Sequence, residues 1–253
     1  MKYIYGPVNS YRLGSSLGID ILSQPEKLCT FGCIYCQLGS KVKYTKERRV
    51  YVKTDEILSE LTDILPKIEI DHITFSGRGE STLAENLGEA ITKIKEMQKK
   101  PVAVLTNSTL MNRADVIKDL SLADVVIAKL DSISMESLKS INQPDEGIRF
   151  CEILESIKNF RKGYQGRFGL QIMLMSKNKD EAENLAKLAL EILPDEVQLG
   201  TPLRKCPVMP ISEEEVFKIK RLFLGLPVVT VYDRKHGKIK PISREETSKR
   251  RGV

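Results

Sequence analysis

The chain has 253 residues, of which 41% are hydrophobic and 29% are charged. These proportions are typical of a folded globular protein and exclude a wholly disordered chain, a collagen and a coiled coil. No apolar run approaches the roughly 20 residues that span a bilayer, and the N-terminal segment lacks the order of a signal peptide, so we expect a soluble cytoplasmic protein with no membrane partner.

The formal net charge of +6 is concentrated at the C-terminal end. Residues 234–253 contain eight Lys and Arg against two acidic residues, whereas residues 1–233 are formally balanced. We therefore divide the chain into a folded domain, residues 1–233, and a basic C-terminal tail, residues 234–253. Such a tail either binds phosphate groups, with RNA as a possible partner, or is a solvated surface segment, and the composition leaves both interpretations open.

Short apolar runs alternate with longer amphipathic stretches after the N-terminal segment, a pattern typical of parallel strands joined by helices. The stretches 57–68, 87–97 and 185–193 repeat their apolar residues at helical spacing. Six β/α units fit this length and eight do not, which predicts an α/β fold, an open partial (β/α)6 barrel with parallel strands plus a C-terminal strand and the basic tail. The predicted strands are Ser16–Leu22, His72–Gly77, Pro101–Asn107, Val125–Asp131, Phe168–Met175, Glu196–Leu203 and the later Pro227–Asp233.

Three of the five cysteines, Cys29, Cys33 and Cys36, follow the first predicted strand directly. The odd number and the close spacing favour metal binding in a reducing compartment over a disulfide framework. Three thiolates leave one position open on an iron-sulfur cluster, whereas a structural zinc site requires a fourth ligand. Of the other two thiols, Cys151 is expected to be buried in a helix, and Cys206 lies just past the sixth strand.

The segment Ser76-Gly-Arg-Gly-Glu80 ends the second predicted strand. Glycines allow a backbone to approach a ligand closely, and a carboxylate complements an ammonium group. Taken alone, the segment is typical of a turn with a solvated acid. Its place at the carboxyl end of a strand, where the loops of such folds gather, favours a ligand site.

Polar residues also end the later strands. Asn107 and Asp131 suit either a ligand or a helix cap. Lys129 requires a partner because a lysine inside an apolar strand is costly when unpaired. Gln171, on the fifth predicted strand, is weaker evidence for a site in the same interior. Further along, Arg204 and Cys206 are candidates for contact with a substrate, or else a surface ion pair and an incidental thiol.

The spacing Cys29-x3-Cys33-x2-Cys36, with Tyr35 before the last cysteine, resembles the signature of the radical S-adenosylmethionine (radical SAM) superfamily. Further elements match in order from about residue 1 to 233. In that family the three cysteines hold a 4Fe-4S cluster, whose remaining iron binds the amino and carboxylate groups of SAM. The resemblance implies Cys29, Cys33 and Cys36 as cluster ligands, and it implies contacts to SAM from Tyr35, Gly77, Gly79, Glu80, Asn107, Lys129, Asp131 and Gln171.

The same resemblance implies an activity. A low-potential electron donor of the flavodoxin or ferredoxin type reduces the cluster, SAM is cleaved to methionine and a 5'-deoxyadenosyl radical, and the radical abstracts hydrogen from a substrate. A tRNA base, a protein side chain and a small metabolite all remain open as substrates, and no catalytic residue is assigned. The alternative is a non-catalytic metal module, a structural zinc or electron-transfer iron-sulfur protein that docks through its basic tail.

The opening segment, residues 5–20, and Cys36-Gln-Leu-Gly39 resemble a microbial subfamily grouped with wyosine-forming, demethylwyosine synthase-like tRNA enzymes. Those enzymes carry extra cysteines upstream of the SAM triplet for a second cluster. This chain has no cysteine before Cys29. We therefore expect one cluster only.

Overall fold

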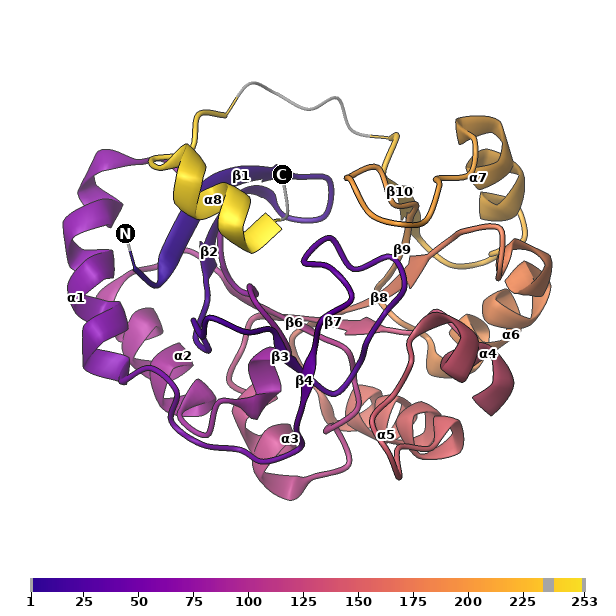
Figure 1. Ribbon diagram of the computed structural model, residues 1–253, viewed down its shortest axis with the longest axis horizontal. Helices are drawn as coiled ribbons and strands as arrows, with labels where there is room; N and C mark the ends of the chain where they lie inside the picture. Colours follow the sequence, from indigo (N-terminus) through magenta and orange to yellow (C-terminus); the bar gives the residue numbers. More distant parts are fainter. Residues whose placement is uncertain (1, 234–238, 252–253) are drawn as a thin grey trace.

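The computed structural model describes residues 2–233 and 239–251. A curved eight-stranded sheet forms a half-barrel, and most of the helices cover its outer face (Figure 1). Along the sheet the strands are β1 (Ile4–Ser10), β2 (Gly14–Ile19), β5 (His72–Phe75), β6 (Val102–Thr106), β7 (Val125–Lys129), β8 (Arg167–Met173), β9 (Glu196–Gly200) and β10 (Val228–Thr230). From β2 to β10 all neighbours are parallel, which confirms the predicted α/β half-barrel.

Most of the helices connect successive strands of the sheet. They are α1 (Thr54–Ile64), α2 (Leu87–Met97), α3 (Ala114–Leu120), α4 (Met135–Ile141), α5 (Phe150–Gly163), α6 (Ala182–Ile192), α7 (Glu213–Lys220) and α8 (Arg244–Arg251), with short 3-10 turns at Leu65–Lys67, Ser81–Leu83 and Lys179–Glu181. A two-stranded ribbon, β3 (Leu28–Cys29) and β4 (Lys43–Tyr44), lies outside the main sheet. None of the helices in the described ranges is long and apolar enough to cross a membrane.

The two faces of the sheet differ in chemistry. Residues such as Leu17, Ile73 and Phe75 point outward into one large apolar core with the helices. On the inner face Ser16 and Thr74 bond to one another through their hydroxyl groups at 2.6 Å. The outer face therefore packs against the helices, whereas the inner face carries polar groups beside a smaller apolar cluster of Leu13, Ala103, Val125 and Ile127.

The N-terminal hairpin was not predicted. Strand β1 pairs antiparallel with β2, and its register shifts between Tyr5 and Val8. Gly6 and Pro7 lie at this irregularity, and both residue types normally argue against a strand interior. A bulged edge strand accommodates them, and this is why the sequence pattern missed the element.

Part of the basic segment is packed on the sheet. Helix α8 lies across β1 (Figure 1), where Ile242 N donates to the Gly6 carbonyl at 2.7 Å and Gly6 N donates to Thr247 Oγ1 at 3.1 Å. Arg250 is only 2% exposed, so the interpretation of the tail as solvated does not hold for this residue, whereas Arg244 and Lys249 are exposed. Residues 234–238 and 252–253 of the predicted tail lie outside the described residues, and the domain boundary at residue 233 stays a prediction.

Candidate active site

The cysteine loop starts at the β3–β4 ribbon and crosses in front of the sheet (Figure 1). Its backbone is anchored to the segment after α4, because Gly32 N donates to the Gln143 carbonyl at 2.9 Å and Ile34 N to the Ile141 carbonyl at 3.0 Å. The thiols of Cys29, Cys33 and Cys36 are all free and half-buried. The loop therefore presents three partly shielded thiols from one rigid segment.

Two amide groups point at these sulfur atoms. Asn107 Nδ2 lies 3.5 Å from Cys29 Sγ, and Asn142 Nδ2 lies 3.4 Å from Cys33 Sγ. Burial, together with the neighbouring Glu80 carboxylate, raises the pKa of the Cys29 thiol to about 12. Hydrogen bonds to sulfur and shielding from solvent are features that tune iron-sulfur clusters.

The thiols suit a cluster by their chemistry. Three soft sulfur donors with amide donors beside them match the ligands and surroundings of an iron-sulfur cluster. Within residues 2–233 and 239–251 no three His, Cys, Asp or Glu side chains form a group that could hold a metal ion. A cubane cluster does not require such convergence, because each cysteine binds a different iron atom. The donor set therefore fits the cluster that the sequence implies.

The Ser76–Glu80 segment pairs directly with the start of the cysteine loop. Leu28 N donates to the Arg78 carbonyl at 3.3 Å, and Glu80 N donates to the Leu28 carbonyl at 3.1 Å. Gly79 has φ +149°, and a Cβ atom there would overlap the Leu28 carbonyl oxygen. At Gly77, with φ +154°, a Cβ would lie 2.5 Å from the Asp20 carboxyl carbon. Here the glycines allow close approach to the protein's own chain.

Glu80 is 3% exposed and lies between the ends of β5 and β6. Its Oε1 accepts from Thr82 N, Thr82 Oγ1 and Thr106 Oγ1 at 3.1, 2.7 and 2.8 Å. Its Oε2 accepts from Asn107 N at 2.7 Å. Despite these donors, burial raises the pKa of the Glu80 carboxyl. Oε2 keeps the larger free acceptor capacity for a further donor.

Lys129 and Asp131 form a second buried group at the ends of β7 and β8. Asp131, 2% exposed, accepts from Met173 N at 2.7 Å and from Tyr35 Oη at 2.5 Å. Lys129 Nζ lies 3.3 Å from Asp131 Oδ1, 4.9 Å from the centre of the Tyr35 ring, and also donates to Gln171 Oε1. The expectation that Lys129 is paired is therefore confirmed.

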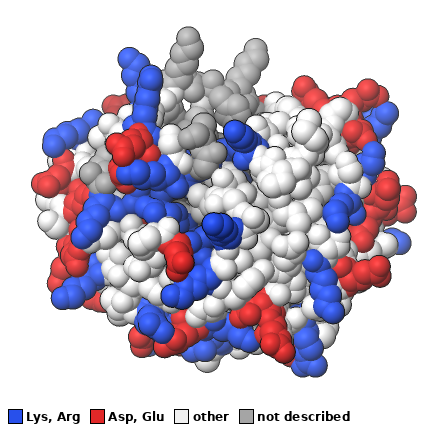
Figure 2. All heavy atoms as spheres, in the orientation of Figure 1, with Lys and Arg blue, Asp and Glu red and all other residues white. Residues whose placement is uncertain are grey.

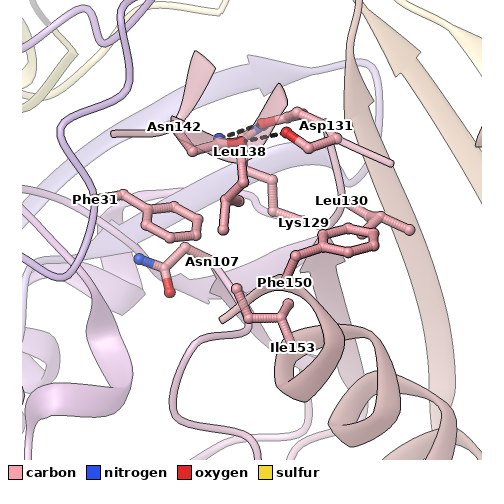
Figure 3. Close-up of a pocket in the computed structure, with 10 residues that line it drawn as sticks. Phe31, Asn107, Lys129, Leu130, Asp131, Leu138, Asn142, Phe150 and Ile153 are labelled. Atoms are coloured by element: carbon pink, nitrogen blue, oxygen red, sulfur yellow. Dashed lines mark hydrogen bonds and ion pairs between the residues drawn. The ribbon is translucent and has the colours of Figure 1, made fainter. Parts of the chain in front are cut away.

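A small cavity of about 10 Å³ lies behind this group (Figure 3). Phe31 and Phe150 line it together with Asn107, Lys129 and Asp131. Its volume suits roughly one water molecule. The ends of β6 and β7 both border this cavity, and so does the cysteine loop through Phe31.

A family model described as the radical SAM superfamily matches residues 26–189. This range contains the three cysteines, the Ser76–Glu80 segment and the ends of β6, β7 and β8. The chain belongs to the radical SAM superfamily. As a member that carries the cysteine motif, it is a radical SAM enzyme.

Relatives place this radical SAM enzyme with the UPF0026 proteins. A UPF0026 protein of Synechocystis sp. is 44% identical over 207 residues, which cover 81% of this chain and 77% of the relative. A Brachyspira hyodysenteriae protein named GTPase Obg is 36% identical over 97% of this chain, and this chain spans 38% of that protein. The narrower resemblance to wyosine-forming tRNA enzymes gains no support from these two relatives.

A solved structure supports the fold of this radical SAM enzyme. The structure of SuiB from Streptococcus suis bound to S-adenosylmethionine has a TM-score of 0.61 and 13% identity, over 81% of this chain and 48% of that chain. At this identity the likeness concerns the fold alone. It confirms the half-barrel architecture.

Several residues at the site differ from their predicted surroundings. Neither Asn107 nor Asp131 caps an α-helix, since α3 and α4 begin after Arg113 and Ser134. Arg204 donates to Gln37 Oε1 of the cysteine loop instead of pairing with a helix acid. Cys151 was expected to be buried and is exposed, because it lies on the solvent side of α5.

Sequence reasoning missed Asn142 and Asn178. Asn142 Nδ2 lies 2.8 Å from Asp131 Oδ2 as well as near Cys33, and Asn178 Nδ2 donates to the Asp131 carbonyl at 2.9 Å. Neither follows a strand directly, and Asn142 ends helix α4. No motif or period marks such residues. The packing of α4 against the strand ends places Asn142, and the turn after β8 places Asn178.

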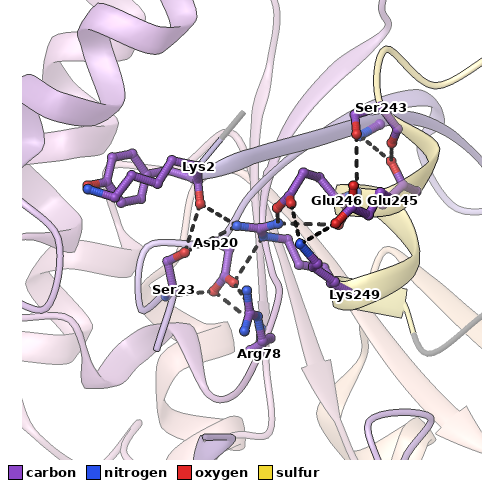
Figure 4. A network of polar contacts seen from close by, with 12 residues as sticks. Lys2, Asp20, Ser23, Arg78, Ser243, Glu245, Glu246 and Lys249 are labelled. Carbon is purple, nitrogen blue, oxygen red and sulfur yellow. Dashed lines mark hydrogen bonds and ion pairs between the residues drawn. The ribbon is translucent and has the colours of Figure 1, made fainter. Parts of the chain in front are cut away.

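Asp20, at the end of β2, was also missed. It is buried and accepts from Ser23 N at 3.0 Å and Arg78 N at 3.2 Å. Arg250 of α8 reaches it with Nε at 3.1 Å from Oδ2 (Figure 4). Through Asp20, helix α8 is therefore connected to the Ser76–Glu80 segment of this radical SAM enzyme.

Proposed function

We propose that this enzyme holds a single 4Fe-4S cluster on Cys29, Cys33 and Cys36 and cleaves SAM reductively for hydrogen abstraction from a substrate. The observation that carries the proposal is the position of Asn107. Its backbone N–H bonds Glu80 Oε2 at 2.7 Å while its side-chain amide points at Cys29 Sγ at 3.5 Å. One residue thus connects the carboxylate proposed for the SAM amino group with a sulfur proposed for the cluster.

When bound, the reduced cluster supplies the electron that cleaves SAM to methionine and a 5'-deoxyadenosyl radical. The chain's own residues bind and orient. Glu80 keeps acceptor capacity on Oε2 in a buried setting, and an ammonium group there would stabilise its ionised form. The backbone of Gly77 and Gly79 fixes this carboxylate against the cysteine loop.

Tyr35, Lys129, Asp131 and Gln171 are proposed to hold the remaining parts of SAM. The ring of Tyr35 is fixed by its bond to Asp131, and the ammonium of Lys129 is fixed by Asp131 and Gln171. Such groups are already in place before a ligand arrives, so little reorganisation is needed on binding. Asn107 completes the set from the end of β6.

The reductant is proposed to be a flavodoxin or ferredoxin type of donor. The substrate is not assigned among a tRNA base, a protein side chain and a small metabolite. RNA binding by the basic segment stays a prediction, which a salt series on the full chain tests through the slope of log affinity against log salt. Arg204 and Cys206 remain candidates on the substrate side, although Cys206 Sγ already lies 3.2 Å from the Val208 carbonyl oxygen.

The test is anaerobic reconstitution followed by analysis of iron, sulfide and deoxyadenosine after addition of SAM and reductant. One complete ligand set predicts about four irons and four sulfides per chain. Replacing Cys29, Cys33 or Cys36 by Ala should abolish both the iron and the product, whereas Cys151→Ala and Cys206→Ala are matched controls that keep the cluster. Zinc in place of iron, or a second full cluster, would contradict the proposal.

A further inference from the structure

Two neighbouring arginines of helix α8 have opposite surroundings. Arg250 is buried against Asp20 Oδ2 at 3.1 Å and Glu246 Oε2 at 2.5 Å. Arg251 is half-buried, yet it makes no hydrogen bond or ion pair with residues 2–233 or 239–251. The charge of Arg250 is compensated by Asp20 and Glu246, whereas the described residues offer no counter-charge to Arg251.

Arg12 at the turn of the β1–β2 hairpin is in the same situation. Its guanidinium lies 5.2 Å from the centre of the Tyr11 ring, and its Nε atom is fully buried with no hydrogen-bond partner among the described residues. The part of the chain that the structure describes offers it no carboxylate. Arg12 also repels Arg251, and this repulsion adds to the burial that lowers the pKa of Arg251.

Both arginines lie near the inner face of the half-barrel. Arg251 interacts electrostatically with Tyr5, whose hydroxyl bonds Ser76 Oγ at 2.6 Å at the start of the Ser76–Glu80 segment. Tyr11 crosses toward β9, so that a Cβ built on Gly200 would lie 3.1 Å from its hydroxyl. The hairpin turn and the end of α8 therefore border the open side of the half-barrel.

A third unpartnered group faces the same space. Gln171 is 4% exposed, and its Nε2 has no hydrogen-bond partner within residues 2–233 and 239–251. A Cβ built on Gly200 would lie 3.6 Å from this nitrogen. Its orientation is fixed, because the Lys129 ammonium can only donate and so requires the amide oxygen. The free N–H groups of Gln171 consequently point away from Lys129, to the side of Tyr11.

We propose that Arg12 and Arg251 bind the oxyanion group, phosphate or carboxylate, of a small-molecule substrate at the open side of the half-barrel. Half-buried cations without a counter-charge are costly, and guanidinium groups match phosphate and carboxylate in pairs of hydrogen bonds. Gln171, a donor at the inner end of the same space, suits a ligand rich in acceptors. This inference rests on the proposed function, because the bound molecule is a substrate only if the chain catalyses that reaction.

A small molecule is favoured over a nucleic acid by the position of these side chains. Figure 2 shows Lys and Arg side chains exposed on the surface around α8, where a phosphate backbone could contact them. Arg12 Nε is instead fully buried, and Arg251 is half-buried beside Tyr5. A group bound between them has to enter the half-barrel.

The test is titration of the full-length chain with inorganic phosphate, pyrophosphate and succinate at constant ionic strength, followed by calorimetry and by thermal unfolding. We expect saturable binding that weakens about tenfold to a hundredfold in Arg12→Gln and in Arg251→Gln, since each change removes a charge-assisted pair. Arg149→Gln is the matched control, because Arg149 is exposed and paired with Glu152 on α5. Tighter binding of pyrophosphate than succinate identifies a phosphate ligand, and the reverse identifies a carboxylate.

Without an anion, both Gln variants should melt no lower than the wild type, because each removes a repulsion. A lower melting temperature, or an equal loss of binding in Arg149→Gln, would overturn the site. Binding of a short single-stranded RNA that exceeds that of pyrophosphate and is lost in Arg251→Gln would overturn the choice of a small molecule. The titration needs neither SAM nor reductant, so a wild type that binds phosphate but not SAM would refute the proposed function alone.

Discussion

The strand-end edge from β5 to β8 and the open side between α8 and the β1–β2 hairpin handle buried charge differently. At the strand ends the charged side chains have polar partners: Glu80 accepts four hydrogen bonds, and Lys129 is paired with Asp131. At the open side Arg12 and Arg251 have no such partner among the described residues. Compensated charges preorganise a site for a ligand, whereas uncompensated ones indicate that the ligand itself brings the counter-charge.

We expect the largest loss of stability from a variant that breaks the charge pair at the strand-end edge. Asp131→Ala leaves the Lys129 ammonium buried without its carboxylate and removes the acceptor for Tyr35, Asn142 and Met173. We expect a loss of about 3–5 kcal/mol in the free energy of unfolding. Urea unfolding measures it, with Glu214→Ala as control, since the pair of Glu214 with Lys218 is exposed and contributes little to stability. A similar small loss in both variants would mean that the edge is not held by this charge pair.

The next effect concerns helix α8. Arg250→Met removes one cation from Asp20, which then keeps Arg78 as its one cationic partner among the described residues. We expect about 2–3 kcal/mol of destabilisation and faster proteolysis within α8, because breaking a buried ion pair leaves the remaining charge buried without its partner. Arg251→Met, one residue on, should not destabilise the chain. Equal losses in the two variants would remove the contrast between compensated and uncompensated arginines.

Glu80→Gln tests whether the carboxylate at the strand-end edge binds SAM. It keeps the size of the side chain and removes the anion proposed to face the SAM ammonium, so SAM affinity should fall about tenfold to a hundredfold. Iron content should be unchanged. Thr82→Val is the control, because it removes one donor to Glu80 while keeping the charge. Unchanged SAM binding in Glu80→Gln, measured by calorimetry on reconstituted protein, would show that Glu80 only holds the strand ends together.

The smallest effect is a pH dependence. Hydrogen bonds from Lys249 and Arg250 lower the pKa of Glu246 to about 2. Since this folded-state pKa lies below the ordinary value, the stabilisation is complete above about pH 4.5 and is lost as the pH falls toward 2. Thermal unfolding from pH 6 to about pH 2 should therefore show a smaller acid loss in Glu246→Gln than in the wild type. Parallel curves would indicate that α8 is not held by this carboxylate.

The sequence determined the parts that depend on local pattern. Alternating apolar runs and amphipathic stretches predicted the parallel half-barrel, because strands covered by helices on one side require apolar residues on their buried face. The spacing of Cys29, Cys33 and Cys36 and the segment at Glu80 identified the superfamily, since such motifs lie within one loop. Each predicted strand ended a few residues too late, because the polar residues at the strand ends turn toward the site.

Tertiary structure alone decided which distant residues meet. Asn142 beside Cys33, Arg250 on Asp20, and Arg251 near Arg12 join segments separated by about a hundred residues or more, and no local period records such contacts. Gly79 illustrates the same limit. The sequence suggested a glycine for a ligand, whereas the fold uses it to bring Glu80 against the carbonyl of Leu28. Packing of α4 and α8 against the strand ends, a long-range event, decides these contacts.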